Sequence, residues 1–159
     1  TTLMAAETPV LFGGMSNSAM ALAEKTLGPM GLDALAVGGS GKDDPSAPTE
    51  FEDGGAIGVE LLRGDVSAMD IGTVTRVDGD EPVAFGHPML GGGASDLPTA
   101  IAKVHWILAS ENRSFKIGEA VRSMGTLVND QQASITVDTK RVASTFPIHI
   151  EIEGVDGAP

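Results

Sequence analysis

Residues 58–90 read GVELLRGDVSAMDIGTVTRVDGDEPVAFGHPML, and their pattern indicates β structure. Within this stretch, residues 68–77 alternate apolar and polar side chains, as a half-buried strand does. Asp78-Gly79 follows directly, and residues 81–85 form a second apolar run. Because an Asp-Gly turn between two such runs is typical of a β-hairpin, the stretch predicts a pair of antiparallel strands.

The pattern continues on both sides of this hairpin. Short runs rich in β-branched and apolar residues recur at spacings near ten residues, broken by Gly, Asn-Asp or charges, which predicts about seven or eight strands in an antiparallel barrel or sandwich. Residues 91–98 (GGGASDLP) are expected to form a flexible loop between strands. The further runs are residues 54–62 and 100–110, SFKIGEA, RSMGTLVND, ASITVDTK and TFPIHIEIEG.

The N-terminal third has a different organisation. Residues 1–12 suggest an extended arm, and Ser16–Leu27 is the one clear helix candidate, with Ser16 or Asn17 as its cap and Gly28-Pro29 as its stop. Residues 32–37 suggest a short strand. The chain therefore divides into an arm and helix (1–37), an acidic, mobile surface linker (38–53) and a β domain (54–159).

Composition narrows the classes of partner. The 159 residues carry a net charge of -12, and such a surface repels phosphate backbones and anionic headgroups, so nucleic-acid binding is not expected. The absence of cysteine excludes disulfides and thiolate metal sites. No apolar run reaches the length of a membrane helix, and the residues that follow Thr1 do not have the basic-then-apolar pattern of a signal peptide. With no initiator Met, we expect the chain to be a piece of something longer.

His87 is the sharpest candidate for chemistry. It stands in Ala-Phe-Gly-His-Pro-Met at the end of a predicted strand, between a residue that frees the backbone and one that stops the ladder. A histidine held rigidly at such a rim is suited to act as a general base. The same pattern also fits a strand-end histidine whose ring is hydrogen-bonded to a backbone carbonyl, and the pattern favours this structural interpretation.

Other polar residues carry weaker signals. Ser16 follows Gly14-Met15 at a turn into the predicted helix, where a hydroxyl can be presented to a substrate, although a helix cap is the simpler interpretation. His105 and His149 alternate with apolar neighbours and are expected to have structural or surface roles. No metal-ligand spacing and no cofactor fingerprint is present, so neither a metal nor a cofactor is expected.

Residues 58–90, together with SFKIGEAVRSMGTLVNDQQASITV (114–137), resemble the SpoIVB-type serine peptidase domain, named after stage IV sporulation protein B. The most specific parts of the likeness are Gly-Thr-Val-Thr, Val-Asp-Gly-Asp and Phe-Gly-His-Pro. The resemblance implies a chymotrypsin-like β-barrel, an exported bacterial protein located in the periplasm or outside the cell, a polypeptide substrate and no cofactor.

The resemblance also implies roles for particular residues. The histidine of Gly-His-Pro is the family's general base, which carries over to His87. The family's aspartate lies downstream of the histidine, where Asp130 and Asp138 are the candidates. Its nucleophile lies in Gly-Met-Ser-Gly-Ser-Pro, which nothing after His87 matches. The nearest likeness is Gly14-Met15-Ser16-Asn17-Ser18-Ala19, upstream of the histidine.

Two functions therefore remain open. The first is a serine endopeptidase, or its barrel fragment, with His87 as base, Ser16 as candidate nucleophile and Asp130 as the carboxylate. The second is a non-catalytic β-barrel module that captures a peptide or a partner protein by strand pairing, with homo-oligomerisation as one form of it.

Overall fold

The computed structural model describes residues 8–37, 44–109 and 114–151. Within them the chain is mainly β, with one α-helix near the N-terminus, as the sequence predicts. The elements are β1 (Thr8–Gly13), α1 (Asn17–Leu27), the short 3₁₀ helix η1 (Gly28–Met30), β2 (Leu32–Ala36), β3 (Ala56–Leu62), β4 (Ser67–Arg76), β5 (Val83–Ala84), β6 (Gly93–Leu108), β7 (Phe115–Gln131) and β8 (Ser134–Asp138).

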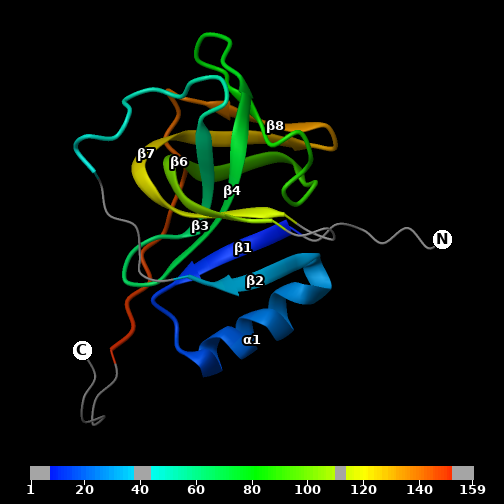
Figure 1. Ribbon diagram of the computed structural model, residues 1–159, viewed down its shortest axis with the longest axis vertical. Coiled ribbons are helices and arrows are strands. Elements are labelled where there is room, and N and C mark those ends of the chain that lie inside the picture. Colours follow the sequence, from blue (N-terminus) through cyan, green and yellow to red (C-terminus); the bar gives the residue numbers. More distant parts are fainter. Residues whose placement is uncertain (1–7, 38–43, 110–113, 152–159) are drawn as a thin grey trace, which may run out of the picture.

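Six strands close into a ring. Their order is β4-β3-β6-β7-β8-β5, and β5 returns to pair with β4. Every pairing in the ring is antiparallel. The β4–β5 pair is the hairpin predicted from the Asp-Gly turn, with Val74 opposite Ala84. This pair is short, yet it turns an open sheet into a closed one. The ring occupies the upper part of Figure 1.

A parallel β-α-β unit extends the sheet from β4. β1 pairs antiparallel with β4 and parallel with β2, and α1 connects the two parallel strands and lies beneath them in Figure 1. Ser16 is the N-cap, since its Oγ accepts a hydrogen bond from the Ala19 amide, and Gly28 ends the helix as predicted. Met20 of α1 packs against Val10 and Phe12 of β1. The residues expected to be an extended arm thus contribute a buried strand.

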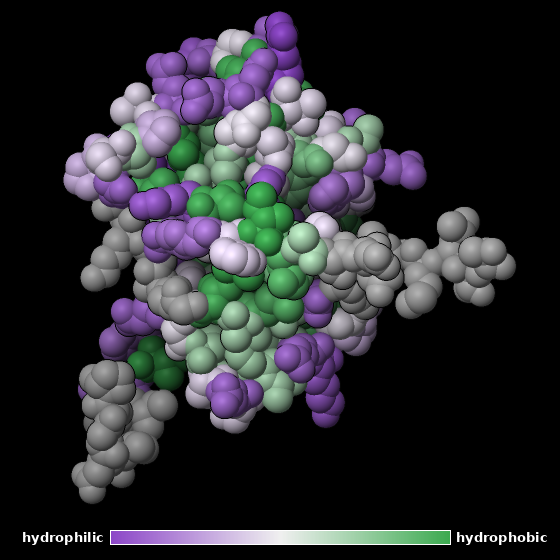
Figure 2. All heavy atoms as spheres, in the orientation of Figure 1, coloured by the Kyte–Doolittle hydropathy of each residue, from purple (hydrophilic) through white to green (hydrophobic). Residues whose placement is uncertain are grey.

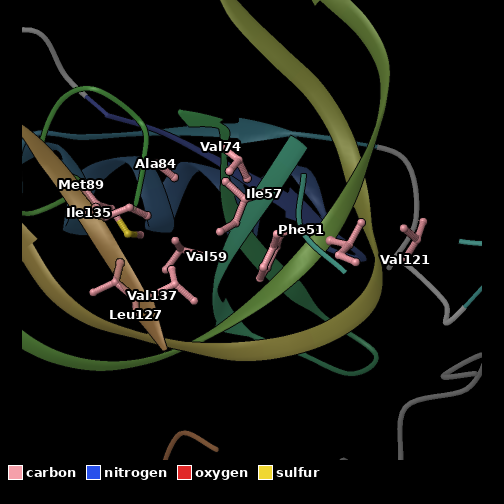
Figure 3. Packing of buried hydrophobic residues seen from close by; sticks show 11 residues of the cluster. Phe51, Ile57, Val59, Val74, Ala84, Met89, Val121, Leu127, Ile135 and Val137 are labelled. Atoms are coloured by element: carbon pink, nitrogen blue, oxygen red, sulfur yellow. The ribbon is translucent and has the colours of Figure 1, made fainter. Parts of the chain in front are cut away.

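The principal core fills the inside of the ring. Strands from every side of the ring contribute aliphatic side chains that point toward one another (Figure 3). The buried members are Phe51, Ile57, Val59, Val74, Ala84, Met89, Ile101, Val121, Leu127, Ile135 and Val137. Alternation along each strand places these residues on one face, which is why the period-two pattern of the sequence identified most of the strands.

Three details differ from the sequence-based expectations. Most of the expected loop 91–98 belongs to β6, which begins at Gly93. The runs SFKIGEA and RSMGTLVND form one strand, β7, because its pairing with β6 continues across their junction, with Ala120 opposite Ala102 and Arg122 opposite Ile101. Residues 145–151 form no strand, and Phe146, Ile148 and Ile150 are exposed.

The acidic segment before the ring is not a loose linker where it is described. Residues 38–43 lie outside the described residues, but residues 44–53 contact the ring. The Arg122 guanidinium of β7 donates to the carbonyls of Pro48 and Ala47 at 2.8 and 3.2 Å. Phe51 is buried in the principal core. Residues 44–53, although their composition is typical of a mobile linker, therefore pack against the ring.

Candidate functional site

His87 lies in a strained turn that follows β5. Phe85 has a φ of 74° and Gly86 a φ of 75°, and Phe85 is the one non-glycine residue in the described part of the chain with a positive φ. A bulky side chain in this region costs about 1–3 kcal/mol and persists only where neighbouring contacts hold it. Here the Phe85 amide donates to the Thr73 carbonyl at 2.9 Å, which fixes the turn against β4.

The Phe85 ring lies directly on Gly72 of β4. A Cβ atom at residue 72 would stand 1.9 Å from Cδ1 of Phe85, so only glycine leaves room for the ring. The Phe85 ring also lies near the imidazole of His87, because the centroids of the two rings are 5.4 Å apart. The glycine of Gly-Thr-Val-Thr therefore accommodates the aromatic residue that precedes Gly-His-Pro, which links the two motifs physically.

The His87 imidazole is exposed, and its tautomer is fixed locally. Nδ1 lies 2.8 Å from the Pro88 carbonyl oxygen, and because a carbonyl only accepts, Nδ1 carries the proton. Nε2 of the neutral ring is then left as a proton acceptor. The hydrogen bond to a backbone carbonyl is the one expected of a structural strand-end histidine. It also leaves the nitrogen that a general base needs available.

Asp130 of β7 holds the segment immediately after this turn. Its Oδ1 accepts from the Met89 amide at 2.9 Å, and its Oδ2 accepts from the Leu90 and Gly91 amides at 2.7 and 2.8 Å. The carboxylate is buried. The hydrogen bonds of Asp130 are thus with the backbone beside His87 and not, as the resemblance had implied, with the imidazole. It fixes the position of His87 through the chain.

A second buried carboxylate, Asp70 of β4, was not identified from the sequence. It is 3% exposed and lies opposite Val59 of β3, which belongs to the principal core, so Asp70 is on the core-facing side of its strand. Burial raises its pKa to about 7, and the nearby charges of His87 and Lys116 oppose that rise. The sequence did contain a signal for it, because Asp70 is an acidic residue at an alternate position that shares a face of the strand with the apolar residues Ala68 and Val74.

Lys116 of β7 completes the group of ionisable side chains near β4. Its Nζ donates to Oγ1 of Thr73, the residue whose carbonyl anchors Phe85. Desolvation lowers the pKa of Lys116, and the charge of Asp70 acts in the opposite direction. The charges of His87 and Lys116, from two other segments of the chain, therefore both act on the Asp70 carboxylate.

Ser16 makes its hydrogen bonds within its own helix cap and not with this group of side chains. Its Oγ accepts from the Ala19 amide at 3.3 Å and lies 3.1 Å from Oγ of Ser18, so its described contacts belong to the helix cap. Within the residues that the structure describes, no hydroxyl is hydrogen-bonded to His87. Asp138, the other carboxylate considered, accepts from the amides of Lys140 and Arg141 in the turn after β8.

The other histidines have local partners. Nε2 of His105 lies 3.1 Å from Oε1 of Glu119 across the β6–β7 pair. His149 is exposed beside Glu151, as expected, but Ile148 and Ile150 are exposed as well, so strand alternation is not the reason. Among residues 8–37, 44–109 and 114–151, no group of three or more His, Asp or Glu side chains is arranged to hold a metal ion. No helix described there is both long and apolar enough to cross a membrane.

Comparison of the chain with family models, curated proteins and solved structures finds no match in any of the three. The resemblance to SpoIVB-type peptidases therefore stays a prediction from sequence motifs.

Proposed function

We propose that this chain is a serine-endopeptidase-like domain of an exported bacterial protein, with a chymotrypsin-like β-barrel and His87 as general base. The observation that carries the proposal is the fixed tautomer of His87, whose Nδ1 is held by the Pro88 carbonyl while the exposed ring retains Nε2 as acceptor. The closed ring of strands agrees with a barrel, and its rim is where such folds present catalytic groups.

The proposed chemistry follows from that nitrogen. Nε2 of His87 accepts the proton of a hydroxyl as its oxygen attacks a peptide carbonyl, and it returns the proton to the leaving amine. Phe85 on Gly72 and the Asp130 carboxylate restrain the turn from both sides, so the imidazole is preorganised. Ser16 is the candidate hydroxyl under this proposal.

A fluorophosphonate probe tests the proposal directly, because it reacts with an activated serine. We expect the folded protein to be labelled, and His87→Ala to reduce the labelling rate by at least about 100-fold, the usual contribution of a general base. Ser16→Ala is expected to abolish labelling and to cost only about 1 kcal/mol as a lost helix cap. The measurement is the labelling rate by mass spectrometry, with circular dichroism as the check on folding.

Matched variants make the result specific. His149→Ala removes an exposed histidine paired only with Glu151, and Ser18→Ala removes the serine beside Ser16; both are expected to label like the parent. A folded protein that is not labelled would refute the endopeptidase proposal for this chain. Labelling that His87→Ala leaves unchanged would refute the role of His87.

A non-catalytic strand-pairing module is the second candidate, and exposed strand surfaces favour it. β2 is the last strand of the sheet and pairs with β1 alone among the described strands. Trp106, Ile107 and Leu108 at the end of β6 are 65%, 58% and 43% exposed. Hydrophobic side chains gather across the middle of the face shown in Figure 2. Open edges and apolar strand ends are the features that pair with another chain.

Trp106 reports on this second candidate because it is the only tryptophan. If a second copy covers the end of β6, raising the protein concentration is expected to shift the Trp106 emission to shorter wavelength and to increase the sedimentation coefficient. Leu108→Ser should weaken both changes, whereas Leu22→Ser on the exposed side of α1 should leave them in place. Emission and sedimentation that are independent of concentration would refute self-pairing at this surface.

A further inference from the structure

Residues 145–151 have the sequence pattern of a β-strand, but no described strand pairs with them. Phe146, Ile148 and Ile150 stand at alternate positions and are 80%, 62% and 77% exposed. The segment has no regular secondary structure. Alternation of this kind places a row of apolar side chains on one face of an extended chain. The segment is therefore suited to join a sheet that its own chain does not provide.

The end of β6 has an open edge. β6 pairs with β3 through residues 99–101 only, whereas its pairing with β7 continues as far as Leu108. Along residues 103–108, no described strand occupies the edge that β3 covers earlier in β6. We call residues 103–108 the open edge of β6. Edges of this kind present backbone N–H and C=O groups with which another chain can pair.

The same part of β6 has an apolar face. Trp106 and Leu108 are opposite Ile117 and Phe115 of β7, so these four side chains share one face of the two-stranded ribbon. Residues 104–107 line an open depression of about 420 Å³. A row of apolar side chains on an added strand would extend this face and remove Trp106 from water.

Residues 145–151 cannot reach the open edge of β6 within their own chain. The Ser144 amide donates to Oδ2 of Asp96 at 3.1 Å, which anchors the segment near the start of β6. Leu108 is roughly 40 Å farther along this strand, whereas Ile150 lies at most about 20 Å beyond Ser144. In Figure 1 the C-terminal segment, orange to red, descends on the left, and β6 ends toward the right. The partner must therefore be another chain.

Charge and backbone chemistry favour one arrangement of the added strand. In an antiparallel pair, Phe146 lies near Leu108, and Glu151 lies near the exposed Lys103, its opposite in charge. Backbone groups of successive residues point alternately to the two sides of a strand. Pairing through residues 146, 148 and 150 leaves Pro147, which has no N–H, on the outer side, where an edge strand tolerates proline.

We propose that residues 145–151 of one copy of this chain add as an antiparallel strand to the open edge of β6 in a second copy. The inference rests on the second candidate function, strand pairing between chains, and names the strand that pairs. Because each copy has one such segment and one such edge, two copies can exchange segments reciprocally and form a closed dimer.

Substitutions in the exposed segment test the inference without disturbing a buried residue. Ile148→Ser is expected to weaken self-association at least about tenfold, because an aliphatic side chain buried on association contributes a factor of that size. The measurement is the protein concentration at which the Trp106 emission and the sedimentation coefficient change. Two controls should stay within about twofold of the parent: Val142→Ser, an exposed apolar residue before the Ser144 anchor, and His149→Ser, on the other face of the segment.

A charge swap tests the direction of pairing. Lys103→Glu and Glu151→Lys are each expected to weaken association about two- to fivefold, as for an exposed ion pair, and the double variant should recover the parent value. Lys25→Glu, in the last turn of α1, makes the same change of charge away from β6 and should have no effect. A salt concentration of about 0.15 M screens the general repulsion between the acidic chains. A double variant that associates no better than the single variants would overturn the antiparallel pairing.

The outcomes separate this inference from the candidate function on which it rests. Weaker association of Ile148→Ser, with both controls unchanged, establishes residues 145–151 as the added strand. If association depends on concentration but Ile148→Ser behaves like the parent, the inference fails while self-pairing of the chain remains. If emission and sedimentation do not change with concentration, self-pairing at β6 is itself refuted.

Discussion

Asp130→Ala is expected to lower the free energy of unfolding by about 3–5 kcal/mol, because it leaves three backbone amides without an acceptor. These amides belong to Met89, Leu90 and Gly91, and the Met89 side chain is buried in the principal core. The loss should appear in urea unfolding as a lower midpoint with an unchanged slope. The labelling rate should fall as well, because the segment that holds His87 loses its anchor.

Two variants bracket this result. Asp130→Asn keeps one carbonyl oxygen as an acceptor and should lose roughly half as much free energy. Asp78→Asn changes an exposed carboxylate in the β4–β5 turn and should stay within about 0.5 kcal/mol of the parent protein. If Asp130→Ala unfolds at the same urea concentration as Asp78→Asn, the carboxylate does not support the loop as described.

The stability of Asp70→Asn, compared with that of the parent protein at the same pH, is expected to increase as the pH rises. The pKa of Asp70 increases from 3.8 to about 7 on folding, chiefly because burial disfavours the charged carboxylate. Between these two values the folded chain binds a proton that the unfolded chain has lost. The free energy of unfolding of the parent protein therefore contains a contribution that is fully present below about pH 4, decreases up to about pH 7 and is absent above it.

The size of this contribution is about 4 kcal/mol, since each pKa unit corresponds to about 1.4 kcal/mol. The quantity to measure is the difference in unfolding free energy between Asp70→Asn and the parent protein, by urea unfolding at about pH 4 and about pH 8. We expect it to move in favour of the variant by about 4 kcal/mol over that range. Comparing the two pH values removes the constant cost of burying the amide. A difference that does not change with pH would show that Asp70 is not a desolvated carboxyl group.

Local pattern was sufficient where neighbouring residues in the sequence also determine the structure. The Asp-Gly turn predicted the β4–β5 hairpin, and Ser16 and Gly28 marked the ends of α1. Phe-Gly-His-Pro placed His87 in a turn at the end of a strand, where the structure has it. In each case a short-range hydrogen bond or a backbone preference fixes the outcome, and both can be recognised in a few residues.

Partners far apart in the sequence were not predictable in the same way. Asp130 was expected to contact His87, but it reaches the amides of Met89, Leu90 and Gly91, 39–41 residues earlier in the chain. Residues 44–53 have the composition of a linker, yet Arg122, about 75 residues later in the chain, holds them by hydrogen bonds to their carbonyl groups. Every residue has a backbone carbonyl, so such contacts leave no pattern in the sequence.

The sequence by itself determined that the chain is mainly β, which segments form most of its strands, and that His87 follows a strand at a restrained turn. These properties depend on the alternation of side chains and on Gly and Pro, which act within a few residues. Only the tertiary structure decided that six strands close into a ring, that Asp70 faces its core, and that the charges of Lys116 and His87 act on Asp70. The register between strands brings these groups together, and register depends on how whole faces of the sheet are buried.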